Sequence, residues 1–134
     1  MKKRLKPQIS GNAIHQIIYI LFFMLLPLKT VSAEVYLMTV RAYDNCKKCT
    51  GKTPRHKAYG ITKSGKVASH GTVAVDPKMI ALGTKLKIEG FGNKVFRAED
   101  VGKAVKGRRI EIWMESHKKA LRFGKKRLRV FVMK

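Results

Sequence analysis

The chain has 134 residues, which allows one compact domain once any leader segment is set aside. Hydrophobic residues make up 45% and charged residues 28%, so the composition excludes a collagen-like or intrinsically disordered chain. The 30 lysines and arginines against 8 acidic residues leave a net charge of +22, which predicts association with a polyanion such as nucleic acid, anionic lipid or an acidic cell-wall polymer.

Residues 1–33 differ from the rest of the chain and are typical of a signal peptide. Basic residues at the start precede the apolar run 17–26, and the small residues of the segment 31–33 end in a cleavage site after Ala33. The apolar run is shorter than the ~20 residues that span a bilayer. We therefore expect an exported mature domain of residues 34–134. The alternative is an uncleaved segment, through which the membrane would be contacted. Export argues against nucleotide-driven activities.

The mature chain alternates apolar and polar residues with a period of two, which predicts strands. Glycines, Asp76-Pro77 and Asn93 supply turns between them. Such short strands with tight turns favour an all-β fold, a small six-stranded barrel with one or two short helices, and we find no internal repeat. The predicted strands are residues 35–43, 72–75, 84–89, 94–99, 109–113 and 128–132.

One helix has clear signals at both ends. Ser116 is a suitable N-cap, residues 117–123 follow, and Gly124 suits the left-handed position after a helix. A single helical turn is also expected at residues 77–82, where Pro77 suits a first helical position.

Cys46 and Cys49 form a CxxC pair that is compatible with a disulfide, a redox motif or half of a metal site. Gly51 and Pro54 follow closely, which argues against the helix start of a redox motif. The spacing of His56, His70 and His117 matches no familiar zinc finger, so we expect no metal. In an exported chain a local disulfide is favoured, although so short a loop gains little stability and the thiols could equally stay reduced.

Three carboxylates lie at or within different predicted strands. Asp76 ends the second strand, Asp100 ends the fourth, and Glu111 lies in the fifth between apolar neighbours. If they converge in one cleft, desolvation would favour a protonated group that suits a general acid. The alternative to a shared cleft is purely structural: Asp76 forms an ordinary Asp-Pro turn, and the side chain of Glu111 points outward.

Basic residues occur in short runs scattered through the chain, which is typical of a solvated cationic surface. No aromatic stacking platform or recognition helix accompanies them, so we expect no nucleic-acid partner.

A set of segments covering nearly the whole mature chain resembles the 3D (three-aspartate) domain of bacterial cell-wall proteins. That family is related to the membrane-bound lytic transglycosylases and to stationary-phase muralytic proteins. The matching segments are residues 39–43, 46–52, 58–65, 72–77, 80–84, 98–102, 105–111 and 116–124.

The resemblance implies a double-psi β-barrel, export, no cofactor, and action on peptidoglycan glycan strands. The family's three aspartates correspond to Asp76, Asp100 and Glu111, with glutamate replacing the third aspartate. Lys103 stands where the family usually has a second glycine after its aspartate.

The resemblance also implies sugar-contacting residues. The segment containing Thr62, Ser64 and Gly65 matches a family Thr-Ala-Ser-Gly loop, with a lysine replacing the alanine. Tyr43 and Lys106 complete the predicted substrate contacts.

The resemblance predicts a lytic transglycosylase that cleaves the MurNAc–GlcNAc bond. Glu111 would protonate the leaving oxygen and then, as a carboxylate, take the proton of the sugar's own 6-hydroxyl, which gives a 1,6-anhydro product. The alternative prediction is a non-catalytic cationic protein that binds peptidoglycan and anionic wall polymers.

Overall fold

The computed structural model describes residues 15, 18–19 and 32–133. The chain divides into two units, Met1–Thr30 and Val31–Lys134, and the second contains the whole fold discussed below. The predicted leader lies outside the described residues except for these few positions. No helix among the described residues combines the length and the apolarity needed to cross a membrane.

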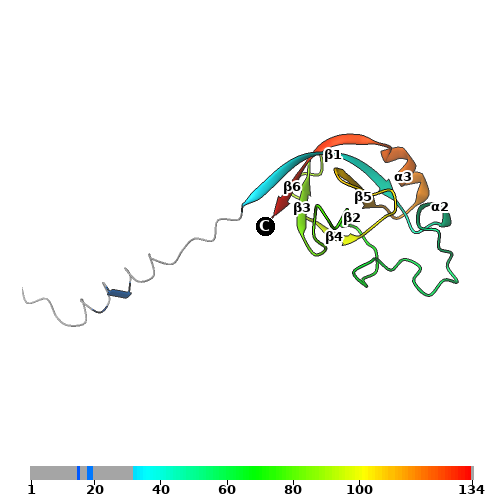
Figure 1. The fold of residues 1–134 in the computed structure, drawn as a ribbon, viewed down its shortest axis with the longest axis horizontal. Helices are drawn as coiled ribbons and strands as arrows, with labels where there is room; N and C mark the ends of the chain where they lie inside the picture. Colours follow the sequence, from blue (N-terminus) through cyan, green and yellow to red (C-terminus); the bar gives the residue numbers. More distant parts are fainter. Residues whose placement is uncertain (1–14, 16–17, 20–31, 134) are drawn as a thin grey trace, which may run out of the picture. The chain divides into compact units, whose positions relative to one another are not determined.

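Six strands close into a barrel in the order β1-β5-β2-β4-β3-β6 (Figure 1). Two short helices lie outside it, so the fold class predicted from the sequence is confirmed. The strands are β1 (Ala33–Tyr43), β2 (Thr72–Ala74), β3 (Lys85–Ile88), β4 (Phe96–Asp100), β5 (Arg109–Trp113) and β6 (Lys126–Met133). The helices are α2 (Lys47–Thr50) and α3 (His117–Phe123).

The strand pairing has an internal two-fold pattern. Strands β1 and β5 are parallel, as are β2 and β4, whereas the other four neighbouring pairs are antiparallel. Exchanging β1, β2 and β3 with β4, β5 and β6 leaves every one of these pairings unchanged. The topology therefore repeats although the sequence does not, and it is that of a double-psi barrel.

The barrel interior is filled by apolar side chains from all six strands, because alternate residues of each strand point inward. In β5, for example, Ile110 and Ile112 are buried while Arg109, Glu111 and Trp113 are only partly buried. The buried core consists of Met38, Val40, Val73, Val75, Ile80, Leu86, Ile88, Phe96, Ala98, Ile110, Ile112, Val130 and Val132. Side chains on the outward face of β5 are thus free to line a surface site.

Helix α3 begins and ends where the sequence predicts. The Ser116 side chain accepts a hydrogen bond from the Lys119 amide, and Gly124 has a positive φ of 70°. At residues 77–82 the expected helical turn is a single turn, in which the amides of Met79 and Ile80 both donate to the Asp76 carbonyl at 2.9 Å. Helix α2 is a single turn that ends at Gly51, with φ 73°.

Candidate functional site

An open pocket of about 620 Å³ lies over the outward face of neighbouring strands β1, β5, β2 and β4. Tyr43, Ala74, Asp100 and Glu111 line it, one from each of these strands. The loops 45–52 and 101–105 supply its walls. Two of the three predicted carboxylates therefore share one pocket.

The strand register explains how these side chains meet. In the strand register, Glu111 lies opposite Arg41 of β1 on one side and opposite Ala74 of β2 on the other. Ala74 in turn lies opposite Asp100 of β4. Paired residues point to the same face of a sheet, so the carboxylates flank Ala74 at backbone positions roughly 10 Å apart. The small methyl group of Ala74 leaves the space between them open.

Asp100 is held by three hydrogen-bond donors. The Tyr43 hydroxyl donates to Oδ2 at 2.9 Å, and the amides of Lys63 and Val101 donate to Oδ1 at 2.9 Å. Because the donors come from β1, the 62–66 turn and the chain following β4, the carboxylate has one fixed orientation. Burial, and then the charge of Asp100, raise the pKa of Tyr43, so its hydroxyl keeps its proton.

Glu111 has a different environment. Its side chain is half-buried, and burial raises its pKa while the charges of Arg41 and Arg109 lower it. No hydrogen bond or ion pair to its carboxyl group occurs within the part of the chain that the structure describes, Lys103 included. The carboxyl group is therefore available for a proton transfer, and burial rather than a neighbouring acid favours its protonated form.

Asp76 lies outside the pocket lining. Its carboxylate accepts from the Gly107 amide at 2.8 Å and from the Lys78 amide at 3.1 Å. These bonds, first that from Gly107, lower its pKa. Asp76 therefore fastens the end of the 102–107 loop, which forms a pocket wall, to the corner that follows β2.

That wall also depends on Gly102. A Cβ atom at this position would come within 2.8 Å of Val105 Cγ2, closer than such atoms approach. Val105 is itself buried in a small cluster with Tyr43 and Ala74. The absence of a side chain at Gly102 thus lets the loop pack onto the pocket floor.

The predicted sugar-contacting residues divide between the pocket and its support. Tyr43 lines the pocket, but Thr62, Ser64, Gly65 and Lys106 do not belong to its lining. Thr62 is buried, and its hydroxyl bonds to the Lys66 carbonyl at 3.0 Å within the same turn. Ser64, Gly65 and Lys106 are exposed.

The cysteines are both free thiols, and Cys49 lines the pocket. Sequence reasoning missed Arg41, Ala74 and the Lys63 amide as contributors to the site. Arg41 and Ala74 could have been found only from the register of β1, β5 and β2, since neither carries a motif.

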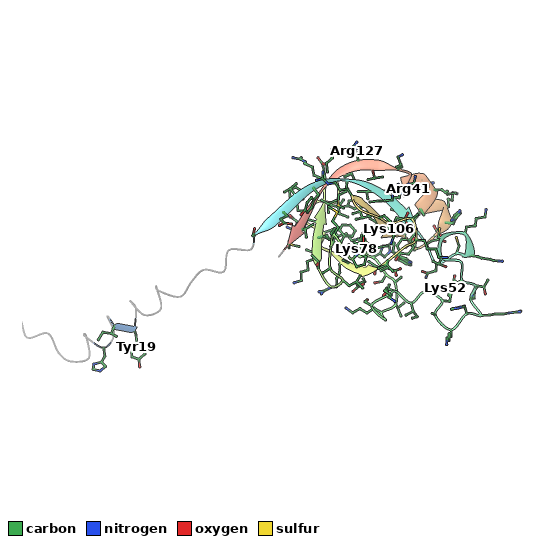
Figure 2. The ribbon with its side chains drawn as sticks, in the orientation of Figure 1. Tyr19, Arg41, Lys52, Lys78, Lys106 and Arg127 are labelled. Atoms are coloured by element: carbon green, nitrogen blue, oxygen red, sulfur yellow. The ribbon has the colours of Figure 1, made fainter. Side chains whose placement is uncertain are left out.

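The basic side chains are distributed around the barrel. Figure 2 labels Arg41, Lys52, Lys78, Lys106 and Arg127, which come from two strands and three different loops. The first two also line the pocket. A polyanionic partner would therefore meet positive charge at the pocket and beyond it.

Replacing Tyr43 by Phe tests the support of Asp100. We expect a loss of about 1–2 kcal/mol in the free energy of unfolding, because a buried hydroxyl bond to a carboxylate disappears while the ring still packs. Urea denaturation measures the change. Tyr59→Phe is the comparison variant, because the Tyr59 hydroxyl has no hydrogen bond among the described residues and the residue lies outside the pocket lining. An unchanged unfolding energy in Tyr43→Phe would contradict the assigned bond.

The sequence model of the 3D domain matches residues 71–134. YabE of Bacillus subtilis, named for cell wall shaping, is 31% identical over 103 residues, which are 76% of this chain and 24% of YabE. The cell wall-binding protein YocH of B. subtilis is 36% identical over 78 residues, 55% of this chain and 26% of YocH. The chain thus aligns with about a quarter of each relative's length.

Among solved structures, E. coli MltA with bound chitohexaose is similar with a TM-score of 0.50 and 26% identity. The similarity covers 61% of this chain and 30% of MltA. Another crystal structure of E. coli MltA, whose fold is described as that of a lytic transglycosylase, has a TM-score of 0.47 and 27% identity over 55% of this chain and 27% of MltA.

Proposed function

Because residues 71–134 belong to the 3D domain family, we propose that the chain is an exported protein that binds peptidoglycan glycan strands and cleaves them as a lytic transglycosylase. The observation that carries this proposal is a pocket in which two carboxyl groups flank Ala74. One is Asp100, whose carboxylate is fixed by hydrogen bonds. The other is Glu111, which is half-buried and has no hydrogen-bond or ion-pair partner among the described residues. Two comparisons support peptidoglycan glycan as the substrate: MltA has a bound oligosaccharide, and the names of this chain's relatives refer to the cell wall.

We propose Glu111 as the acid and base of the reaction. Its proton passes to the glycosidic oxygen, and the bond from that oxygen to the anomeric carbon breaks. The carboxylate left behind takes the proton of the same sugar's 6-hydroxyl while that oxygen bonds to the anomeric carbon. The Glu111 proton is thereby restored, and no water is consumed.

We propose that Asp100 stabilises the positive charge that develops on the sugar ring, since its donors hold the carboxylate in place. Asp76 would act through the loop it fastens. The Tyr43 ring would contact the glycan in the pocket. The turn of Thr62, Ser64 and Gly65 and the ammonium group of Lys106 would contact it beyond the pocket.

The test is to incubate the purified protein with insoluble peptidoglycan and analyse the soluble fraction by mass spectrometry. Release of 1,6-anhydro muropeptides is the expected result. Reducing-end muropeptides carrying added water would contradict the transglycosylase step.

The second candidate function is binding of the wall without cleavage, favoured by the dispersed basic side chains. It predicts that the protein sediments with peptidoglycan while no soluble product appears. Added salt should then release the protein, because exposed charges are screened.

The pH dependence tests the environment of Glu111. A general acid works in its protonated form, so the rate should fall as the pH rises through the raised pKa of Glu111. Arg41→Ala removes a charge that lowers this pKa, so we expect the alkaline limb of the kcat profile to move to higher pH, by less than about one pH unit for an exposed arginine. Arg127→Ala is the matched control, and an alkaline limb that moves to lower pH in Arg41→Ala would contradict the assignment.

A further inference from the structure

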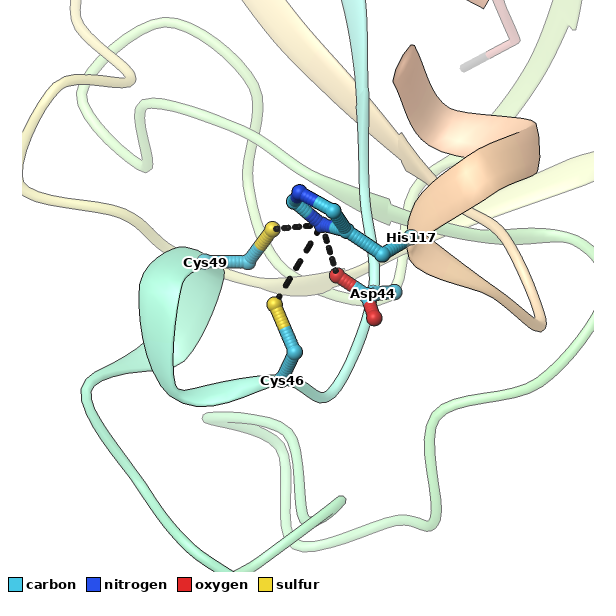
Figure 3. A group of neighbouring side chains, drawn as sticks. All are labelled: Asp44, Cys46, Cys49 and His117. Carbon is cyan, nitrogen blue, oxygen red and sulfur yellow. Dashed lines mark hydrogen bonds and ion pairs between the residues drawn. The ribbon is translucent and has the colours of Figure 1, made fainter. Parts of the chain in front are cut away.

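Four side chains with metal-binding atoms converge beside the pocket: Asp44, Cys46, Cys49 and His117 (Figure 3). Asp44 follows β1, Cys46 is the N-cap residue of α2, Cys49 lies in α2, and His117 is the first residue of α3. Their ligand atoms all lie within 4.8 Å of one another. Residues separated by some seventy positions in the chain are thus brought to one point by the fold.

The distances centre on one nitrogen atom. His117 Nδ1 lies 3.4 Å from Cys46 Sγ, 3.8 Å from Cys49 Sγ and 3.3 Å from Asp44 Oδ1. A single ring nitrogen carries at most one proton, so it can donate to only one of these three atoms. The two thiols can also donate to the Asp44 carboxylate, but those bonds do not require Nδ1 to face both sulfurs.

Tetrahedral coordination does explain the distances. With Zn–S bonds of about 2.3 Å and Zn–N or Zn–O bonds of about 2.0–2.1 Å, sulfur and nitrogen ligands lie about 3.5 Å apart, and nitrogen and oxygen ligands about 3.3 Å apart. The three separations around His117 Nδ1 agree with these values to within about 0.3 Å.

We propose that Asp44, Cys46, Cys49 and His117 bind one zinc ion. The mixed set of two sulfurs, one nitrogen and one oxygen suits zinc rather than magnesium or calcium, which prefer oxygen ligands. Four protein ligands fill a tetrahedral shell, so the site is structural and leaves no position for substrate.

The site would connect the wall of the pocket to the C-terminal helix. Cys49 and its neighbours Lys48 and Thr50 line the pocket, whereas His117 begins α3. Zinc would therefore fix the 45–52 loop against α3. The spacing of the histidines along the sequence did not indicate this zinc site, because its single histidine ligand is about seventy residues away from the cysteines in the sequence.

The experiment uses the purified protein, reduced, loaded with Zn²⁺ and dialysed, with metal content measured by mass spectrometry. We expect about one zinc per chain, and a lower melting temperature after removal of the metal with a chelator. Cys46→Ser and His117→Ala should each lose the retained zinc. His56→Ala is the matched control and should keep it.

A second measurement does not depend on the variants folding. Cobalt(II) added to the unsubstituted, metal-free protein should give the visible absorption of a tetrahedral site together with a thiolate-to-cobalt charge-transfer band. Zinc retention equal in the unsubstituted protein and Cys46→Ser would overturn the proposal. The proposal would also be overturned if Cys46 and Cys49 form a disulfide in the folded protein and the chelator does not change its melting temperature.

Discussion

Replacing Glu111 by Gln is expected to reduce the release of 1,6-anhydro muropeptides by about 100- to 10,000-fold, the range that general acid–base catalysis contributes. Gln has nearly the shape of Glu, so the packing on the outward face of β5 is kept. Its amide cannot give a proton to the glycosidic oxygen and cannot take one from the 6-hydroxyl. The measurement is the initial rate of product release, quantified by mass spectrometry.

Glu115→Gln is the matched control. Glu115 is exposed, lies outside the pocket, and pairs with His70 and Lys119 at the surface. Pairs of this kind contribute little to stability, so its activity should match that of the unsubstituted protein. Sedimentation with peptidoglycan should be unchanged in both variants. Equal rates of release from Glu111→Gln and Glu115→Gln would remove Glu111 from the reaction and assign the proton transfer to another group.

The strands and the long helix could be predicted from the sequence because their signals are local. Alternation of two residue classes located β5 at Arg109–Trp113, and a capping serine with a following glycine located α3 at both ends. In the other strands some ends differ by one or two residues, as in β6, which begins at Lys126 rather than at residue 128. The α2 turn was missed because four residues carry no periodic pattern.

The candidate site could be predicted only in part because its geometry depends on long-range register. Sequence reasoning named Asp100 and Glu111 as residues that could converge, and the register around Ala74 brings them to one pocket. It also indicated that desolvation would favour the protonated form of such a group. Burial is indeed what raises the pKa of Glu111, opposed by the charges of Arg41 and Arg109, which the sequence did not place beside it.

The largest effect on stability is expected at Phe96. Its side chain is fully buried at the start of β4, and its ring meets Phe91 edge-on with centroids 5.2 Å apart. Phe96→Ala should lower the free energy of unfolding by about 3–5 kcal/mol, because the lost transfer energy is joined by the cost of the cavity left behind. A domain of this size has about 5–15 kcal/mol in total, so a large share of the margin disappears.

Urea denaturation measures this loss as a lower midpoint with an unchanged slope. Phe123→Ala is the matched control: this ring packs against the core from the end of α3 and is only partly buried, so less than half the loss is expected.

A comparison of Phe96→Ala with Glu111→Gln also separates the stability of the barrel from the chemistry of the pocket. Phe96 lies four residues before Asp100 on the same strand, yet its side chain points into the core and not into the pocket. At temperatures where Phe96→Ala remains folded, its rate per folded molecule should therefore stay close to that of the unsubstituted protein, whereas Glu111→Gln should lose activity without losing stability. A Phe96→Ala protein that keeps its unfolding free energy would mean that the barrel core is not closed around this ring.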